Sequence, residues 1–443
     1  MTRAPAAFAS PVERYECSSL RCSARSSPDP RSLSAVHGAG IMRYQNGFFF
    51  SGCPMVFAGF LPWEYGVRNL FRRPLRTGLT WLGLSTSCLL ILVVVGFIRG
   101  LEKTLTVSGE EDVAIVLALG MGENIEYSSI PMRTSDLLRA EVDEIRRRRG
   151  RAYVSPELYL GTQIRVEDEP EETLGLVRGV THSVLLVRRQ VSILSGAWPG
   201  PNEIIVGRLA AAKLGAENSQ LAIGKSIELE GRRWTISGLF SAGGSVFESE
   251  LWCRLDDLQQ AMKRQDLSIV AVTCQSEIDV RQVSAFCKRR LDLELQSMRE
   301  TDYYGTLQSD YGPVRMLAWL MVVLVAGAGV FAGLNTMYGA ALGRIREMAT
   351  LQTLGFGRLA IMVSLVQEGL LLGMAAAVTA TLFAMVFVHG LAVRFTMGAF
   401  QLNIDSIAIL VGCGTGMMLG FIGALPPAWR ALSFPIADGL KAI

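Results

Sequence analysis

Four long stretches of this sequence contain no charged side chain, and they constrain its fold more than any other feature. They comprise 22, 28, 20 and 24 residues, at 77–98, 316–343, 369–388 and 406–429. A helix rises about 1.5 Å per residue, so about 20 apolar residues cross the roughly 30 Å hydrocarbon core of a bilayer. One such stretch could be a buried core helix, but four of them predict a membrane bundle of four transmembrane helices. A single soluble globule is excluded, because the charged residues, 19% of the chain, are confined to the other segments.

Basic residues beside these stretches predict the orientation of the chain, because Lys and Arg close to a span stay on the cytoplasmic side. Nine lie on one side (Arg68, Arg72, Arg73, Arg76, Arg344, Arg346, Arg358, Arg430 and Lys441) and four on the other (Arg99, Lys103, Arg315 and Arg394). We therefore expect a multi-pass membrane protein with both termini in the cytoplasm and residues 99–315 outside it. These flanks account for the net charge of +3, so nucleic acid is not an expected partner.

The first 54 residues differ from the rest. They are rich in Arg, Ser, Pro and Ala without helical or strand periodicity, which predicts a disordered or non-native extension, with Met55 as an alternative start. Phe50–Cys53 resembles a lipoprotein cleavage box, but the apolar run Gly47–Phe50 is shorter than the about 7 to 15 residues that a signal peptide needs. Residues 55–76 combine aromatic and basic side chains, which predicts an amphipathic cytoplasmic helix lying on the membrane.

Residues 99–315 have the pattern of a water-exposed α+β domain. Lys225–Phe240 alternates apolar and polar side chains on both sides of Gly231, which is typical of a β-hairpin. Residues 203–206 and 267–273 are further strand candidates, rich in Ile and Val. Apolar residues three and four apart predict helices at 135–149, 208–214, 255–264 and 279–291. These short interleaved units allow a domain of two lobes.

No pattern in this domain predicts catalysis or ligand binding. Gly224–Ser226 imitates the end of a phosphate loop, but the position that must hold its first Gly is Ser219. Arg146–Arg149 is interpreted as a solvated basic turn at a helix end, and Glu167–Glu172, which lacks the spacing of a calcium loop, as an exposed turn. The three His and eight Cys residues lack metal-ligand spacing, and the domain's three cysteines, read as apolar fillers, allow at most one disulfide. We expect no catalytic residue, metal or cofactor.

Two motifs carry a specific resemblance. Residues 343–373 read "GRIREMATLQTLGFGRLAIMVSLVQEGLLLG", and the chain ends "GFIGALPPAWRALSFPIADGLKAI". Both closely resemble the permease subunits of MacB/FtsX-type ABC transporters, a family that includes macrolide exporters, lipoprotein-releasing permeases, DevC-like permeases and the division protein FtsX. The segment "NLFRRPLRTGLTWLGLS" resembles the same family, and "GAWPGPNEIIVGRLAAAKLG" and "IGKSIELEGRRWTISGLF" look like its MacB-like periplasmic core.

The resemblance implies a multi-pass protein of the bacterial inner membrane, and it implies how the chain is divided. Its parts would be an N-terminal extension (1–54), an amphipathic helix (55–76), transmembrane helices (77–98, 316–343, 359–388 and 406–429), a MacB-like α+β periplasmic domain inserted between the first two of them (99–315), a cytoplasmic coupling segment (344–358), a short outer loop (389–405) and a cytoplasmic tail (430–443).

In such permeases the coupling segment docks on a separate ATPase. The resemblance implies ATPase-coupling residues at Arg344, Ile345, Arg346, Glu347, Met348, Leu351, Leu354 and Gly355. The alternative is that the charged residues among them, Arg344, Arg346 and Glu347, only fix the orientation of the chain in the membrane. Glu368 is expected to be paired or interfacial rather than catalytic, because an isolated carboxylate at membrane depth is costly.

The resemblance also implies a mechanism in which this chain is not an enzyme. The sequence has no nucleotide-binding motif, so a partner ATPase would drive motion through the first two spans to the outer domain, for export or extraction of a substrate. Implied partners are the ATPase, a second permease copy or paralogue, a membrane-fusion adaptor or other envelope protein, and lipids. An FtsX-like regulator that transmits a signal without transport is the open alternative. A membrane enzyme is disfavoured, because the four uncharged stretches contain no Asp, Glu or Lys.

Overall fold

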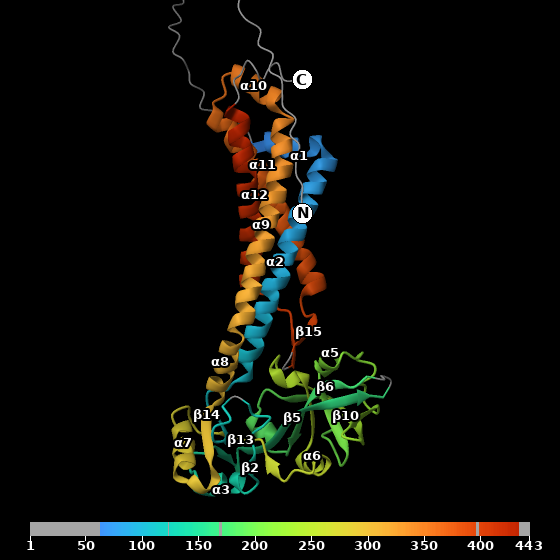
Figure 1. The fold of residues 1–443 in the computed structure, drawn as a ribbon, viewed down its shortest axis with the longest axis vertical. Coiled ribbons are helices and arrows are strands. Elements are labelled where there is room, and N and C mark those ends of the chain that lie inside the picture. The colour runs from blue at the N-terminus through green and yellow to red at the C-terminus, as the bar shows by residue number, and fades with distance from the viewer. Residues whose placement is uncertain (1–62, 123, 168–170, 396–397, 434–443) are drawn as a thin grey trace, which may run out of the picture. The chain divides into compact units, whose positions relative to one another are not determined.

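The computed structural model describes residues 63–122, 124–167, 171–395 and 398–433 (Figure 1). The predicted extension at 1–54 and the end of the predicted tail lie outside the described residues. Four helices in the described part are long and apolar enough to cross a membrane: α2 (Pro74–Ser108), α9 (Gly312–Leu342), α11 (Arg358–Phe383) continued by the π-helical turn η3 (Ala384–Val388), and α12 (Ser406–Ser433). Each coincides with one of the uncharged stretches, so the prediction of four apolar helices is confirmed.

Proline residues stand at the start of two of these helices. Pro74 lies in the first turn of α2, where a missing N–H costs no helical hydrogen bond, and it separates α2 from the short amphipathic helix α1 (Trp63–Arg72). α2 then continues unbroken for 35 residues, about 52 Å, well past the stretch that ends at residue 98. Pro313 stands likewise in the first turn of α9, and Tyr311 separates α9 from α8 (Glu300–Asp310). The connection through α2 is therefore one unbroken helix. The connection through α8 and α9 is interrupted at Tyr311, which we call the joint between them.

Helices α11 and α12 approach each other through glycines. A Cβ on Gly373 would meet the carbonyl oxygen of Gly416, and a Cβ on Gly420 would meet that of Gly369. Small residues at such positions let two backbones come into direct contact. Gly414, also on α12, has open space where its Cβ would stand. Only one side of α12 therefore requires glycine for its packing.

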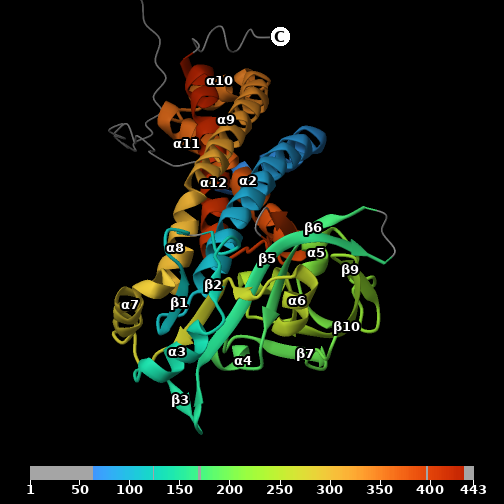
Figure 2. The ribbon, with the colours of Figure 1, turned by 60° about the horizontal axis from the view of Figure 1, so that its bottom comes forward.

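The strands between α2 and α9 in chain order are β1 (Val113–Ala118), β2 (Ile130–Pro131), β3 (Arg147–Arg148), β4 (Arg151–Ala152), β5 (Val154–Val166), β6 (Thr173–Val180), β7 (Ser192–Gly196), β8 (Glu203–Gly207), β9 (Ser226–Leu229), β10 (Arg232–Ser241), β11 (Glu250–Arg254), β12 (Asp266–Leu267), β13 (Ile269–Thr273) and β14 (Leu295–Arg299). β5, β6, β11, β8, β10 and β9 pair in this order, and β9 pairs back with β5, so these strands close into a barrel (Figure 2). The first half of β5 also pairs with β13, which continues through β1 to β14 as an open sheet. β6–β11 and β8–β10 are parallel, so the sheet is mixed.

Short helices complete this region: α3 (Thr134–Glu141), α4 (Val184–Val187), α5 (Ala210–Leu214), η1 (Val246–Ser249), α6 (Leu255–Met262), α7 (Val280–Arg289) and η2 (Leu291–Leu293). A hydrophobic core runs through both the barrel and the open sheet, and Trp234 within it is fully buried. Cys253, Cys274 and Cys287 are buried and free. Burial raises the pKa of the Cys287 thiol to about 11 and that of Cys274 to about 12. These cysteines therefore fill apolar space, as the sequence predicted.

Two local predictions had opposite outcomes. The hairpin at 225–240 is confirmed: β9 and β10 pair with Leu229 opposite Arg232, around a turn in which Glu230 and Gly231 both have positive φ. The helix at 135–149 is wrong, because α3 ends at Glu141 and the chain turns into the β3–β4 hairpin. The basic run therefore does not follow a helix end. Its Arg149 and Gly150 form the hairpin turn, with φ of 51° and 76°.

The segment at 389–405, predicted as a short loop, contains a hairpin of β15 (Ala392–Phe395) and β16 (Gly398–Gln401). This hairpin contacts the α+β region: Lys213 of α5 donates a hydrogen bond to the Phe395 carbonyl at 3.3 Å. Phe400 packs edge-on against Phe97 of α2, with ring centroids 5.2 Å apart. The α+β region is thus contacted by α2, by α8 and by this hairpin.

Candidate functional sites

The short helix α10 (Ile345–Thr353) joins α9 to α11 and has one buried and one exposed face. Met348 is 4% exposed and packs with Ile361 and Leu432, and the partly buried Ile345 and Leu351 lie against the same cluster. The helix ends where Gly355 takes a φ of +95°, a left-handed conformation that glycine adopts without strain. Ile345, Met348 and Leu351, which were proposed for coupling, therefore pack against the bundle and hold α10 in place.

The exposed face carries the other proposed residues. Arg346 and Glu347 are exposed, and Leu354 is 70% exposed. Leu359, just after the turn, is 73% exposed and extends this apolar edge. Arg344, by contrast, is buried and does not contribute to the surface. The face open to a partner thus combines two opposite charges with two leucines.

Arg344 instead belongs to a buried polar group, here called the Glu368 cluster, that consists of Asn69, Arg344 and Glu368. The guanidinium of Arg344 donates to both carboxylate oxygens of Glu368, at 3.2 and 2.9 Å, and the Asn69 amide donates to one of them at 3.1 Å. Buried charges persist when they are paired and hydrogen-bonded. The expectation that Glu368 is paired is confirmed, and the cluster joins α1, α11 and the residue before α10.

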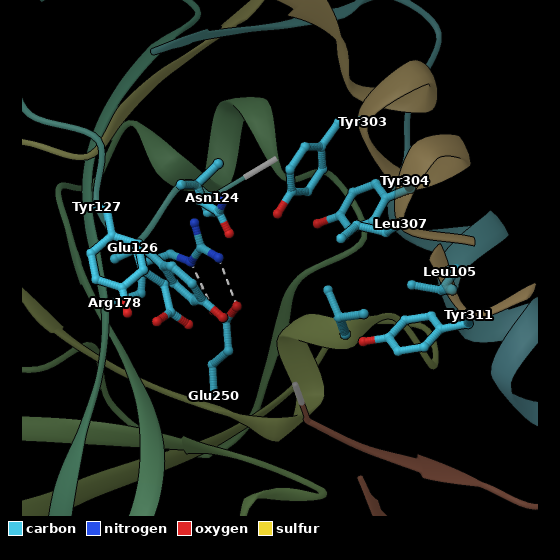
Figure 3. Close-up of a pocket in the computed structure, with 13 residues that line it drawn as sticks. Leu105, Asn124, Glu126, Tyr127, Arg178, Glu250, Tyr303, Tyr304, Leu307 and Tyr311 are labelled. Carbon is cyan, nitrogen blue, oxygen red and sulfur yellow. Dashed lines mark hydrogen bonds and ion pairs between the residues drawn. The ribbon is translucent and has the colours of Figure 1, made fainter. Parts of the chain in front are cut away.

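A second site is a cavity of about 260 Å³ where α2 and α8 meet the barrel (Figure 3). We call it the tyrosine cavity. Its lining comes from α2, the loop after β1, the barrel strands, η1, α8 and the joint between α8 and α9: Leu105, Asn124, Ile125, Glu126, Tyr127, Tyr159, Arg178, Val246, Glu250, Tyr303, Tyr304, Leu307 and Tyr311. Residues far apart in the sequence thus converge at one place.

An ion-pair network forms the back of this cavity. Arg178, 2% exposed, donates to Glu250 through Nε and Nη2 at 2.7 and 2.6 Å, and to Glu157 through Nη1 at 2.7 Å. Arg188 contacts Glu300, and its Nε lies 3.5 Å from Glu157. Burial alone would favour the neutral acid at Glu157, but Arg188 and Arg178 hold the pKa of its carboxyl below the usual value. These ion pairs connect β5, β6 and β11 with the start of α8.

The front of the cavity is lined by phenols. The hydroxyls of Tyr303, Tyr304 and Tyr311 point into the space in front of Arg178 and Glu250 (Figure 3). Within the described part of the chain, none of these three hydroxyls has a hydrogen-bond partner. Burial raises the pKa of Tyr303 well above its usual value, so the phenol keeps its proton. Sequence reasoning missed this cavity, and no local spacing links its residues.

Comparison with known families assigns both halves of the chain. Residues 77–286 match the family model of the MacB-like periplasmic core domain, and residues 319–436 match that of the FtsX-like permease C-terminal region. The chain belongs to the MacB/FtsX-type ABC transporter permeases. It is accordingly a multi-pass protein of the inner membrane. Within this permease, α10 and the Glu368 side chain lie in the FtsX-like region, whereas α8 with Tyr303 and Tyr304 lies between the two matched regions.

Individual relatives are distant. The permease is 20% identical over 286 residues to the lipoprotein-releasing system transmembrane protein LolC of two strains of Xylella fastidiosa, covering 58% of this chain and 69% of the relative. Among solved structures it is similar to the extracellular domain of the noncanonic ABC-type transporter YknZ from Gram-positive bacteria (16% identity, TM-score 0.33, 42% of this chain and 100% of the other). It is also similar to the periplasmic region of MacB from Actinobacillus actinomycetemcomitans (11% identity, TM-score 0.35, 47% and 97%).

Proposed function

We propose that this permease couples ATP hydrolysis by a separate ATPase subunit to motion of its α+β domain, for export or extraction of a substrate by mechanotransmission. The observation that carries the proposal is the unbroken helix α2. Asn69 belongs to α1, the separate helix that precedes α2, and is held in the Glu368 cluster. Ser108, at its end, accepts a hydrogen bond from the backbone N–H of Val246 in η1, at 2.9 Å. One rigid element therefore connects the neighbourhood of α10 with the α+β domain.

The topology belongs to the same proposal. Residues 99–315 form an extracytoplasmic domain inserted between the first two spans, and residues 344–358 face the cytoplasm, as the basic flanks indicate. The exposed face of α10 then meets the ATPase through Arg346, Glu347 and Leu354. The Glu368 cluster transmits force from α10 to α11 and α1, because its ion pair and hydrogen bond lie on the path between them.

A second permease copy or a paralogue completes the transporter in this proposal, and an envelope adaptor is a further candidate partner. The alternative function is an FtsX-like regulator, in which the same motion acts on a cell-envelope protein without transport. Copurification discriminates between them: an outer-membrane channel or membrane-fusion adaptor supports export, whereas a peptidoglycan hydrolase supports regulation.

The coupling proposal is tested by reversing both exposed charges, Arg346→Glu together with Glu347→Arg. Exposed charges contribute less than about 1 kcal/mol each to stability, so expression and thermal stability should be nearly unchanged. At a partner interface the same reversal creates like-charge contacts, so copurification of the ATPase and substrate-stimulated ATP hydrolysis should be lost.

The matched control is the same kind of reversal at an exposed pair in the α+β domain, Arg165→Glu with Glu228→Arg, whose charged atoms lie 3.1 Å apart. This control should keep the bound ATPase and its stimulated activity. If the α10 reversal also keeps the bound ATPase and its stimulated activity, the coupling assignment is wrong, and Arg346 and Glu347 only fix the topology.

A further inference from the structure

The charges around the tyrosine cavity do not balance. Behind and beside it, the guanidinium groups of Arg178 and Arg188 face the carboxylates of Glu157, Glu250 and Glu300. A fourth carboxylate, Glu126, lines the cavity and has no ion pair of its own in the described structure. Burial raises its pKa, and the more distant charge of Lys213 offsets this only in part. Two guanidinium groups therefore face three carboxylates before Glu126 is counted, so carboxylates outnumber arginines at this cavity.

The oxygens that line the cavity include the hydroxyls of Tyr303, Tyr304 and Tyr311 and the carboxylates of Glu126 and Glu250. The amide of Asn124 and the guanidinium of Arg178 are the lining side chains that carry nitrogen. Three of the five N–H groups of Arg178 already donate to Glu250 and Glu157, so its charge is shared by two carboxylates. An anionic ligand would therefore meet the carboxylates of Glu126 and Glu250, and a guanidinium that is already paired with two carboxylates.

We propose that the tyrosine cavity binds a small organic cation. The partly negative phenol oxygens and the carboxylates of Glu126 and Glu250 attract a positive charge, including that of a quaternary ammonium group that has no N–H to donate. A bare metal ion fits less well, because no group of three or more His, Cys, Asp or Glu side chains in the described residues could hold one. One water occupies about 30 Å³ in the liquid, so about 260 Å³ holds one small organic molecule.

The position of the cavity gives such a ligand a consequence beyond binding. Tyr303, Tyr304 and Leu307 belong to α8, and Tyr311 is the joint between α8 and α9, whereas Arg178 belongs to the barrel. A bound cation would therefore contact both sides of the junction between helices and barrel. It would favour the arrangement in which these groups are close, since a ligand shifts an equilibrium by its differential affinity for the two states.

The test uses the whole permease, purified in an uncharged maltoside detergent, and isothermal titration calorimetry. The probe is choline, and its control is dimethylbutanol, the carbon isostere that has the same shape without the charge. Choline should bind at least tenfold more tightly than dimethylbutanol. This comparison requires no variant, and it is independent of the ATPase, so it separates this proposal from the coupling proposal. Equal affinities, or no binding of choline, would overturn the proposal.

Two variants locate the site. Glu126→Gln is nearly isosteric and removes the carboxylate that has no ion pair in the described structure, so choline should bind about tenfold more weakly while dimethylbutanol is unaffected. The control Glu228→Gln removes an exposed carboxylate on β9, which does not line the cavity, and should leave both affinities unchanged. If choline binds Glu126→Gln as tightly as the unmodified permease, the site is not the tyrosine cavity.

Discussion

The Glu368 cluster predicts a specific effect of Glu368→Gln. The change keeps the shape of the side chain and its acceptor for Asn69, but it removes the charge that faces Arg344. The two side chains are only 10% and 9% exposed, so the Arg344 guanidinium would be left buried without a counter-ion. Breaking a buried pair by removing one partner costs about 3 to 5 kcal/mol. Because this pair is not fully enclosed, we expect the lower end, about 3 kcal/mol.

This loss should concentrate in α10, because Arg344 directly precedes that helix. Local opening sets the rate of backbone hydrogen exchange, and each 1.4 kcal/mol corresponds to a factor of ten. The amides of α10 should therefore exchange roughly a hundredfold faster in Glu368→Gln. The exposed neighbour provides the control: Arg346→Gln should leave their exchange unchanged. Unaltered exchange across α10 in Glu368→Gln would refute the view that the cluster holds this helix.

Two further predictions concern the bundle and its orientation. Gly373→Ala should destabilise the permease by about 1 to 3 kcal/mol, because the new Cβ meets the Gly416 backbone, whereas Gly414→Ala has open space and should change stability by less than about 1 kcal/mol. Thermal unfolding in detergent checks the pair, and equal effects would contradict the close packing of α11 and α12. Arg233→Cys should react with a membrane-impermeant thiol reagent in intact spheroplasts more than the unmodified chain does. Reaction only after the inner membrane is opened would overturn the proposed topology.

The sequence predicted those parts of the fold in which local pattern and final environment agree. In the β9–β10 hairpin, alternation of side chains matches alternation of burial along β10, so the pattern was sufficient. At 135–149 the apolar spacing continued past the real end of the helix. Val142 and Ile145 lie beyond the end of the helix and are nevertheless buried, and Ile145 forms a β-bridge with Cys274. Spacing alone does not distinguish these two ways of burying the same residues.

The Glu368 cluster and the tyrosine cavity were harder to predict from the sequence than the secondary structure. A carboxylate near a membrane span had to be paired, so the state of Glu368 was predictable, but its partner Asn69 is 299 residues away. The tyrosine cavity combines Leu105, Arg178 and Tyr311, which only the tertiary fold brings together. Sequence patterns report on local periodicity and on the cost of isolated charges. They do not report which distant side chains meet.

The two helical connections to the α+β domain differ in continuity, because α2 is unbroken whereas α8 and α9 are separate helices that meet at Tyr311. If the proposed coupling moves α2 and α9 together, the unbroken α2 would fix one point of the domain, and the domain would tilt about that point as the angle at Tyr311 changes. Tyr311 also lines the cavity. A ligand in the cavity would therefore contact the residue at which α8 and α9 meet, and would restrict that change of angle.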